Sequence, residues 1–225
     1  MAMTPNREIR VWDLPVRVFH WLLVGLVIVS LITGNIGGVW EMELHLVTGS
    51  AVLALILFRA AWGLVGSSTA RFSDFVRGPK AVIGYLLGLL AGRKATVLGH
   101  NPLGGWSVVA MLSSLALQAI TGLFANDDVL TKGPLAKFVT KRMSDLITEV
   151  HEVNANLLYI LIAFHLAAVL GYYFFKRENL VRPMITGSKS LPADTDVATP
   201  RLASPWLALV LALAAASIVW RAVTL

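Results

Sequence analysis

The stretch HEVNANLLYILIAFHLAAVLGYYFF at residues 151–175 decides the fold. Glu152 is its only acidic residue, and it contains no lysine or arginine. Because a helix of about 20 mostly apolar residues crosses the hydrocarbon core of a bilayer, this stretch predicts a transmembrane helix. It also carries two histidines, His151 and His165, and an ionisable residue inside a membrane helix is a functional candidate.

Other apolar runs extend this prediction to a protein with several spans. Four further runs are long enough to cross a membrane, at residues 16–34, 45–65, 104–124 and 205–223. A shorter run at 81–91 cannot cross, and we expect it to lie along the membrane surface or to form a short helix after Pro79. We therefore predict an all-α integral membrane protein. It comprises a four-helix bundle over residues 1–186, a polar linker at 187–204 and a fifth, C-terminal transmembrane helix within 205–225.

The composition agrees with a membrane protein. The chain has 225 residues, of which 56% are hydrophobic and only 14% are charged, whereas a soluble domain carries about 25% charged residues. It has no cysteine, which excludes disulfides, thiolate metal sites, iron–sulfur clusters and the covalent attachment of a c-type haem. Any haem must therefore be held without a covalent bond to the protein.

The basic residues set the expected orientation. With the N-terminus on the cytoplasmic side, 14 of the 19 lysines and arginines fall in inner segments and five in outer ones, as the positive-inside rule requires. An odd number of spans then places the C-terminus on the outer side of the membrane. The net charge of +6 follows from this topology, so we expect no nucleic-acid partner. The first 15 residues are too charged for a cleavable signal peptide, and we expect the first helix to stay as an anchor.

Four histidines fall at two depths in this arrangement. His20 and His165 lie near the inner face, and His45 and His151 lie near the outer face. Within one helix, His151 and His165 are about 21 Å apart along the axis and within roughly 40° of one face. We therefore predict two stacked haems, the outer one ligated by His45 and His151 and the inner one by His20 and His165.

Two arginines are candidates for contacts with the haem propionates. Arg59 follows His45 by 14 residues, on the same helix face and at the depth of the inner haem, and Arg17 precedes His20 by one turn. An arginine keeps its proton and cannot ligate iron, but it pairs well with a carboxylate. The alternative is that both side chains extend to the inner lipid headgroups. Gly49, one turn after His45, either leaves room for a flat macrocycle or serves helix packing.

The fifth histidine has no equivalent partner, and several motifs of other protein classes are absent. His100 lies in GHNPLGG before the third span and has no partner at its depth. We expect a turn or helix-entry role for it, with a contact to a propionate or a quinone as the alternative. The chain lacks the H-E-x-x-H, Walker and dinucleotide-binding motifs. A proton-coupled transporter with a histidine relay is the alternative from a different class, but no inverted repeat or pair of discontinuous helices supports it.

Several segments resemble one known family. They are VWDLPVRVFHW (11–21), HLVTGSAVLALILFRAAWGLVG (45–66), RFSDFVRGP (71–79), GHNPLGGW (99–106), QAITGLF (118–124) and the helix from His151 to His165. Through them, residues 11–175 resemble the bacterial di-haem cytochrome b561 proteins, which overlap with the cytochrome b subunits of nickel–iron hydrogenases. The resemblance implies a four-helix core in the bacterial cytoplasmic membrane that holds two non-covalent b haems. The family's ligand positions are occupied here by His20, His45, His151 and His165.

The resemblance implies electron transfer across the membrane. Two imidazoles fill both axial positions of an iron and leave no open site for a substrate. We expect the protein to contact membrane lipid. At one end of the electron path we expect a quinone, which is both a partner and a further candidate ligand. At the other end we expect a c-type cytochrome or a dehydrogenase subunit. The outer loop at 125–150 is the expected docking surface or quinone-site lid.

Two alternative functions for a membrane electron-transfer protein that binds haem stay open. One is a membrane anchor that accepts electrons from a hydrogenase or similar dehydrogenase, and the other is a superoxide:quinone oxidoreductase or metal-reducing enzyme that works at the outer haem. The sequence also leaves open whether the chain is an oxidoreductase by itself or a subunit of one. A homo-oligomer is a further open alternative.

Overall fold

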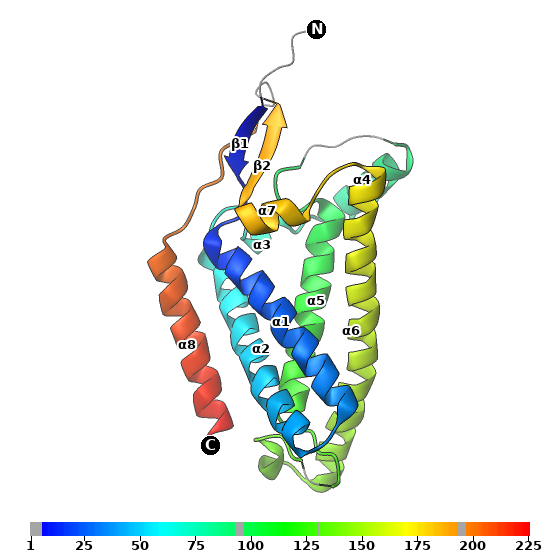
Figure 1. The fold of residues 1–225 in the computed structure, drawn as a ribbon, viewed down its shortest axis with the longest axis vertical. Helices are drawn as coiled ribbons and strands as arrows, with labels where there is room; N and C mark the ends of the chain where they lie inside the picture. Colours follow the sequence, from blue (N-terminus) through cyan, green and yellow to red (C-terminus); the bar gives the residue numbers. More distant parts are fainter. Residues whose placement is uncertain (1–5, 93–96, 130, 193–196) are drawn as a thin grey trace. The chain divides into compact units, whose positions relative to one another are not determined.

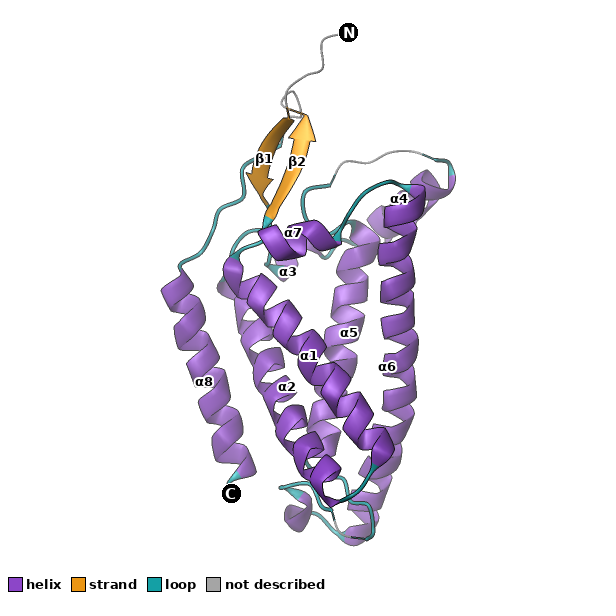
Figure 2. Ribbon diagram, viewed as in Figure 1, coloured by secondary structure: helices purple, strands orange, loops and turns teal. Residues whose placement is uncertain are grey.

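The structure is a computed structural model that describes residues 6–92, 97–129, 131–192 and 197–225. The described residues are mostly helical (Figure 2). In chain order (Figure 1), the elements are β1 (Asn6–Arg10), α1 (Leu14–Ile36), α2 (Val39–Val65), α3 (Phe72–Phe75), α4 (Pro79–Leu90), α5 (Pro102–Gly122), a 3₁₀ turn (Ala136–Phe138), α6 (Lys141–Phe175), α7 (Val181–Thr186), β2 (Ser188–Pro192) and α8 (Pro205–Val223).

Five of the described helices are long and apolar enough to cross a membrane, namely α1, α2, α5, α6 and α8. This confirms the prediction of an all-α membrane protein with five candidate spans. The shorter apolar run forms α4, whose 12 residues are too few to cross, as its length predicted.

Two helices begin at least six residues before the predicted spans. Helix α2 starts at Val39 rather than at residue 45, and α6 starts at Lys141 rather than at residue 151. Both additional segments carry charged residues, which a search for apolar runs does not include. The prediction of a loop at 125–150 is therefore wrong in its second part. There, Lys141 donates a hydrogen bond of 2.7 Å to Asp145 one turn later, a spacing that supports a helix.

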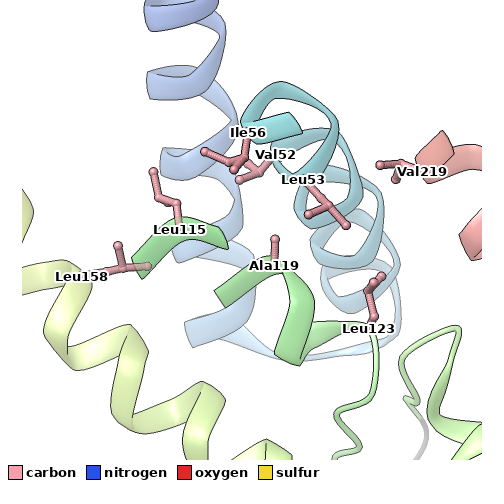
Figure 3. Close-up of a cluster of buried hydrophobic side chains, with 8 residues drawn as sticks. All are labelled: Val52, Leu53, Ile56, Leu115, Ala119, Leu123, Leu158 and Val219. Atoms are coloured by element: carbon pink, nitrogen blue, oxygen red, sulfur yellow. The ribbon is translucent and has the colours of Figure 1, made fainter. Parts of the chain in front are cut away.

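The chain divides into two compact units. The first unit comprises residues 1–18, 61–109 and 164–208, and the second comprises residues 19–60, 110–163 and 209–225. In the second unit, segments of α1, α2, α5, α6 and α8 pack around buried apolar side chains (Figure 3). The buried members are Val52, Leu53, Ile56, Leu115, Ala119, Leu123, Leu158 and Val219.

A short turn places α2 beside α1 in the second unit. Gly37 and Gly38 have φ angles of +70° and +97°, a left-handed backbone that glycine adopts without steric cost. Across the resulting hairpin, the Ser30 hydroxyl of α1 donates a hydrogen bond of 2.7 Å to the Thr48 hydroxyl of α2. Residues at the start of α2 therefore face the end of α1.

The connection from α5 to α6 is also tied back to its helices. The Gly133 amide donates to the Ala125 carbonyl and the Leu135 amide donates to the Leu123 carbonyl, both at 2.8 Å. The Asn126 side chain donates to the Ser144 hydroxyl of α6 at 2.6 Å. The connection is thus an ordered cap over this end of the two helices within the second unit.

In the first unit, a buried carboxylate fixes the start of α1. Asp13 is 5% exposed and Trp62 is fully buried. One Asp13 oxygen accepts the Val16 amide at 2.7 Å, which caps the helix, and the other accepts the Trp62 indole N–H at 3.0 Å. Trp62 thus packs inside the protein.

A two-stranded sheet in the first unit was not predicted. Strand β1 pairs antiparallel with β2, with Asn6 opposite Pro192 and Arg10 opposite Ser188. The pairing joins residues far apart in the chain, and β2 lies in the segment predicted as a polar linker. Further along this segment, the Ala203 amide donates to the Ser67 hydroxyl at 2.9 Å, so its C-terminal part is also bound to the first unit.

Candidate functional site

The second unit brings two of the four candidate histidines together. His45 comes from the beginning of α2 and His151 from the third turn of α6. Their ring centroids are 6.2 Å apart, and the ring planes lie at 79° to each other. The outer pair that the sequence proposed is therefore within reach of a single bound atom.

Both rings line one pocket, which is formed by α1, α2, α5, α6 and Pro134 of the α5–α6 connection. The remaining lining is largely apolar, with Gly49 on the α2 side and Leu158 on the α6 side. A methyl group built on Gly49 would meet no atom within 4 Å. The pocket thus has open space beside His45, where the sequence predicted room for a flat group.

Hydrogen bonding determines which nitrogen of His45 can act as a ligand. Its Nδ1 atom lies 2.9 Å from the backbone carbonyl oxygen of Ser30 and 3.5 Å from the Thr33 hydroxyl. A carbonyl oxygen can only accept, so Nδ1 carries the proton in the neutral ring. Nε2 then keeps its lone pair, which is the pattern of a metal-ligating histidine held by its other nitrogen.

His151 shows the same pattern with a different partner. Its Nδ1 atom lies 3.0 Å from the Thr121 hydroxyl oxygen. That hydroxyl donates its own proton to the Leu117 carbonyl at 2.7 Å, so it accepts from Nδ1. The tautomer is again Nδ1–H, with the lone pair on Nε2.

A glycine lies against each imidazole. A Cβ built on Gly34 would be 2.9 Å from Cε1 of His45, and one built on Gly122 would be 3.1 Å from Cε1 of His151. Such distances are shorter than an ordinary van der Waals contact. Each ring is therefore held between a hydrogen-bond acceptor and a backbone that approaches closely because it lacks a side chain.

The geometry of the pair fits one iron with two imidazole ligands. Metal–imidazole nitrogen bonds are about 2 Å long, which places the two ring centroids about 6 Å apart. Among the described residues, no group of three or more His, Cys, Asp or Glu side chains could hold a metal ion. A bis-histidine haem needs only two protein ligands, because the macrocycle supplies the others, and the arrangement of His45 and His151 meets this requirement.

A satisfied polar network lies next to the pocket. Asn154 is 3% exposed and donates to the Ser114 carbonyl at 3.0 Å and to the Gln118 side-chain oxygen at 2.6 Å. Its own oxygen accepts the Ser114 hydroxyl at 2.9 Å. Buried polar groups inside a membrane protein must find such partners, and this network fixes the Gln118 side chain at the pocket wall.

The two predicted ligands of the inner haem belong to different units. His20 lies in the second unit and His165 in the first, so their pairing stays a prediction. Arg59 is 3% exposed. A side chain that extends to lipid headgroups would be exposed, so this burial favours an interior role for Arg59, and the contact with a propionate stays a prediction.

Arg17 and His100 both belong to the first unit. The Arg17 guanidinium donates to the Ile185 carbonyl of α7, which ties the beginning of α1 to that helix, and its propionate role stays a prediction. The His100 ring lies 4.6 Å from the Phe75 ring and 4.8 Å from the Trp12 ring, centroid to centroid. It directly precedes the Asn101 cap of α5, whose side chain accepts the Gly104 amide at 2.8 Å, in agreement with a helix-entry position.

Sequence reasoning missed the groups that hold the two histidines. Thr121 and Gly122 lie within QAITGLF, which carried part of the family resemblance, but neither was singled out. We call the groups around His45 the α1 cradle and those around His151 the α5 cradle. The sequence holds a signal for both, because Ile-Thr-Gly occurs at residues 32–34 and again at 120–122. The Ser30 contact gives no such signal, since any residue supplies a backbone carbonyl.

Comparison with known protein families gives one match, described as prokaryotic cytochrome b561, over residues 11–187. Comparison with curated proteins and with solved structures gives no match. The family match covers more than half of the chain, and it agrees with the apolar helices and the histidine pair described above. The chain therefore belongs to the prokaryotic cytochrome b561 family of membrane electron-transfer proteins, a family that binds haem b.

Proposed function

We propose that this member of the prokaryotic cytochrome b561 family transfers electrons across the bacterial cytoplasmic membrane through two bis-histidine b haems. His45 and His151 would hold the outer haem, and His20 and His165 the inner one. The observation that carries the proposal is the pair of imidazoles 6.2 Å apart in an apolar pocket, each with Nδ1 bonded to the protein and Nε2 available.

The roles of the residues follow from this geometry. When bound, the haem supplies an iron that gains and loses one electron. His45 and His151 would hold the iron through two imidazoles, which would leave it no open site for oxygen or a substrate. The apolar lining of the pocket excludes water, and it leaves the potential to be set by the ligands and their hydrogen bonds. The chain would thus conduct electrons rather than transform a substrate at the iron.

The inner haem rests on helix geometry. His165 follows His151 by 14 residues in the continuous helix α6, a rise of about 21 Å on nearly the same face. His20 lies about two turns into α1, and Arg59 lies 14 residues beyond His45 in α2. These spacings support a second haem at the inner depth, with the buried Arg59 guanidinium as a counter-charge for a propionate.

A membrane quinone at one end and a redox protein at the other are the proposed partners. Pro134 of the α5–α6 connection lines the pocket of the two histidines, which supports this connection as the docking surface or quinone-site lid beside the outer haem. A c-type cytochrome is the expected protein partner. A co-purifying iron–sulfur subunit would instead identify the chain as the membrane anchor of a hydrogenase or similar dehydrogenase. Quinone-dependent oxidation of superoxide by the purified protein would identify it as a superoxide:quinone oxidoreductase.

The purified protein tests the haem proposal directly. We expect the reduced-minus-oxidised spectrum of a b cytochrome and two haems per chain after extraction. His45→Ala and His151→Ala should each lose the same redox component, while His20→Ala and His165→Ala should lose the other. His100→Ala serves as the control histidine and should keep both. A colourless protein, or loss of the same component from His20→Ala and His45→Ala, would contradict the proposal.

A further inference from the structure

The two candidate ligands of the outer haem rest on equivalent segments of different helices. Residues 30–34 of α1 read SLITG, and residues 118–122 of α5 read QAITG. In each segment the first residue offers a backbone carbonyl, the fourth a threonine hydroxyl and the fifth a glycine. Positions i, i+3 and i+4 share one face of a helix, so all three groups lie on the face that is turned toward the imidazole.

The two cradles use their acceptors differently. In the α1 cradle, Nδ1 of His45 lies 2.9 Å from the Ser30 carbonyl and 3.5 Å from the Thr33 hydroxyl, a distance at the limit of a hydrogen bond. In the α5 cradle, Nδ1 of His151 is 3.0 Å from the Thr121 hydroxyl. The partner of His45 is therefore the backbone, and the partner of His151 includes a side chain that substitution can remove.

From this difference we infer that Thr121 is a positioning residue that sets the redox potential of the outer haem through His151, whereas Thr33, at a longer distance from His45, contributes much less. The inference rests on the proposed ligation of that haem by His45 and His151. An acceptor on Nδ1–H raises the basicity of the imidazole and fixes its orientation toward a metal. The stronger donor stabilises ferric iron more than ferrous iron, because ferric iron carries one more positive charge. Thr121 thus lowers the potential of this haem.

Thr33 provides a matched control for Thr121. Both threonines are buried, with 5% exposure for Thr33 and 7% for Thr121. Both donate to the carbonyl four residues earlier, Thr33 to Val29 at 2.8 Å and Thr121 to Leu117 at 2.7 Å. The two sites differ in the distance from the hydroxyl to the imidazole. Replacement by valine therefore removes the same helix contacts at both sites, but a short hydrogen bond to histidine only at residue 121.

The test compares midpoint potentials in the haem-loaded, full-length protein. Loss of a partner group outside the ligand sphere costs about 10- to 100-fold in metal affinity. We expect the lower end of this range for Thr121→Val, because the threonine hydroxyl is a neutral acceptor. A tenfold loss that falls on the ferric state alone raises the potential by about 59 mV. Thr121→Ser, which keeps the hydroxyl, should restore the wild-type value, and Thr33→Val should shift the potential much less than Thr121→Val, because the Ser30 carbonyl still holds His45.

A spectroscopic readout and a binding readout keep the test decisive. In the ferric state, the axial ligand-field signature of one haem should change in Thr121→Val and not in Thr121→Ser. If Thr121→Val binds the outer haem too weakly for titration, retention of the inner haem shows that the chain is folded. A haem affinity at least tenfold lower than in Thr121→Ser then supports the inference.

Two results would overturn the role of Thr121. One is an unchanged potential and signature in Thr121→Val, and the other is an equal change in Thr33→Val. His151→Ala separates this failure from failure of the proposed function. If His151→Ala keeps both haems, the ligation itself is wrong. If His151→Ala loses one haem while Thr121→Val behaves as wild type, only the positioning role fails.

Discussion

A methyl group at residue 34 should disturb the outer haem site without weakening the helix that carries it. The Cβ atom of an alanine there would lie 2.9 Å from Cε1 and 3.1 Å from Nδ1 of His45, whereas ordinary contacts begin at 3.4 Å. The imidazole must therefore retreat by about 0.5 Å, the difference between 3.4 and 2.9 Å. Ligand positions in a functional site tolerate about this much displacement, so we expect Gly34→Ala to displace Nε2 from its ligating position.

The expected loss of haem affinity is about tenfold, since a misplacement of 1 Å costs on the order of 100-fold. Glycine to alanine in a helix interior is itself favourable by about 1 kcal/mol. A lower affinity would therefore not reflect a weaker α1. Gly122→Ala, whose Cβ would be 3.1 Å from Cε1 of His151, should give a smaller loss, because the ring needs to move only about 0.3 Å.

The assay is titration of haem into purified apoprotein, followed by a count of the redox components. Gly25→Ala is the matched control, because it lies in the same helix α1 and its added Cβ meets nothing within 4 Å. It should bind both haems as the wild type does. Wild-type affinity for both haems in Gly34→Ala, or an equal loss in Gly25→Ala, would refute the idea that Gly34 is kept small by the histidine.

Three further outcomes are expected. Arg59→Leu should lower the midpoint potential of the inner haem by a few tens of millivolts, because a buried cation favours the reduced iron; the outer haem, about 21 Å away, should move much less. A reporter fused to the C-terminus should be active in the periplasm and inactive in the cytoplasm. Asn154→Leu should lower the free energy of unfolding by about 1–3 kcal/mol, because Ser114 and Gln118 lose their partner and membrane hydrogen bonds contribute about 0.6–1.7 kcal/mol each. As a control, Asn156→Leu at an exposed position should change the free energy of unfolding little.

The spans could be predicted from the sequence because the membrane imposes a simple rule. A helix that crosses needs about 20 apolar residues, and each predicted run lies in a long helix except for Leu123 and Phe124, which follow the end of α5. The ends were less predictable, because α2 and α6 continue into charged segments that carry no hydropathy signal. Strand β2 was missed for a different reason. It is defined by pairing with β1, more than 170 residues earlier in the chain, and a pairing of that kind has no local pattern.

The outer histidine pair was proposed from depth alone, and the structure brings His45 and His151 together. Depth is set by the helix rise, which the sequence provides directly. The groups around the rings were not predictable in the same way. The contact of His45 with Ser30 is made by the backbone, and the contact of His151 with Thr121 depends on how α5 is rotated against α6. Periodicity places a residue on a face of its own helix but does not say which neighbour it meets.

The hydrogen bonds around the pocket favour a ligated group over a hydrogen-bonded substrate or a proton relay. The polar side chains of its wall already have partners within the protein: the Ser30 hydroxyl donates to Thr48 at 2.7 Å, the Ser50 hydroxyl to a backbone carbonyl at 2.8 Å, and the Gln118 oxygen accepts from Asn154. A relay through the histidines would need a titratable group next in line, but the Nδ1 proton of His45 faces a carbonyl that cannot carry a proton onward. Within the part of the chain that the structure describes, the two Nε2 lone pairs are then the nitrogen ligands that the pocket offers to a metal. Two neutral imidazoles with ring centroids 6.2 Å apart in a largely apolar pocket are suited to hold one metal ion between them.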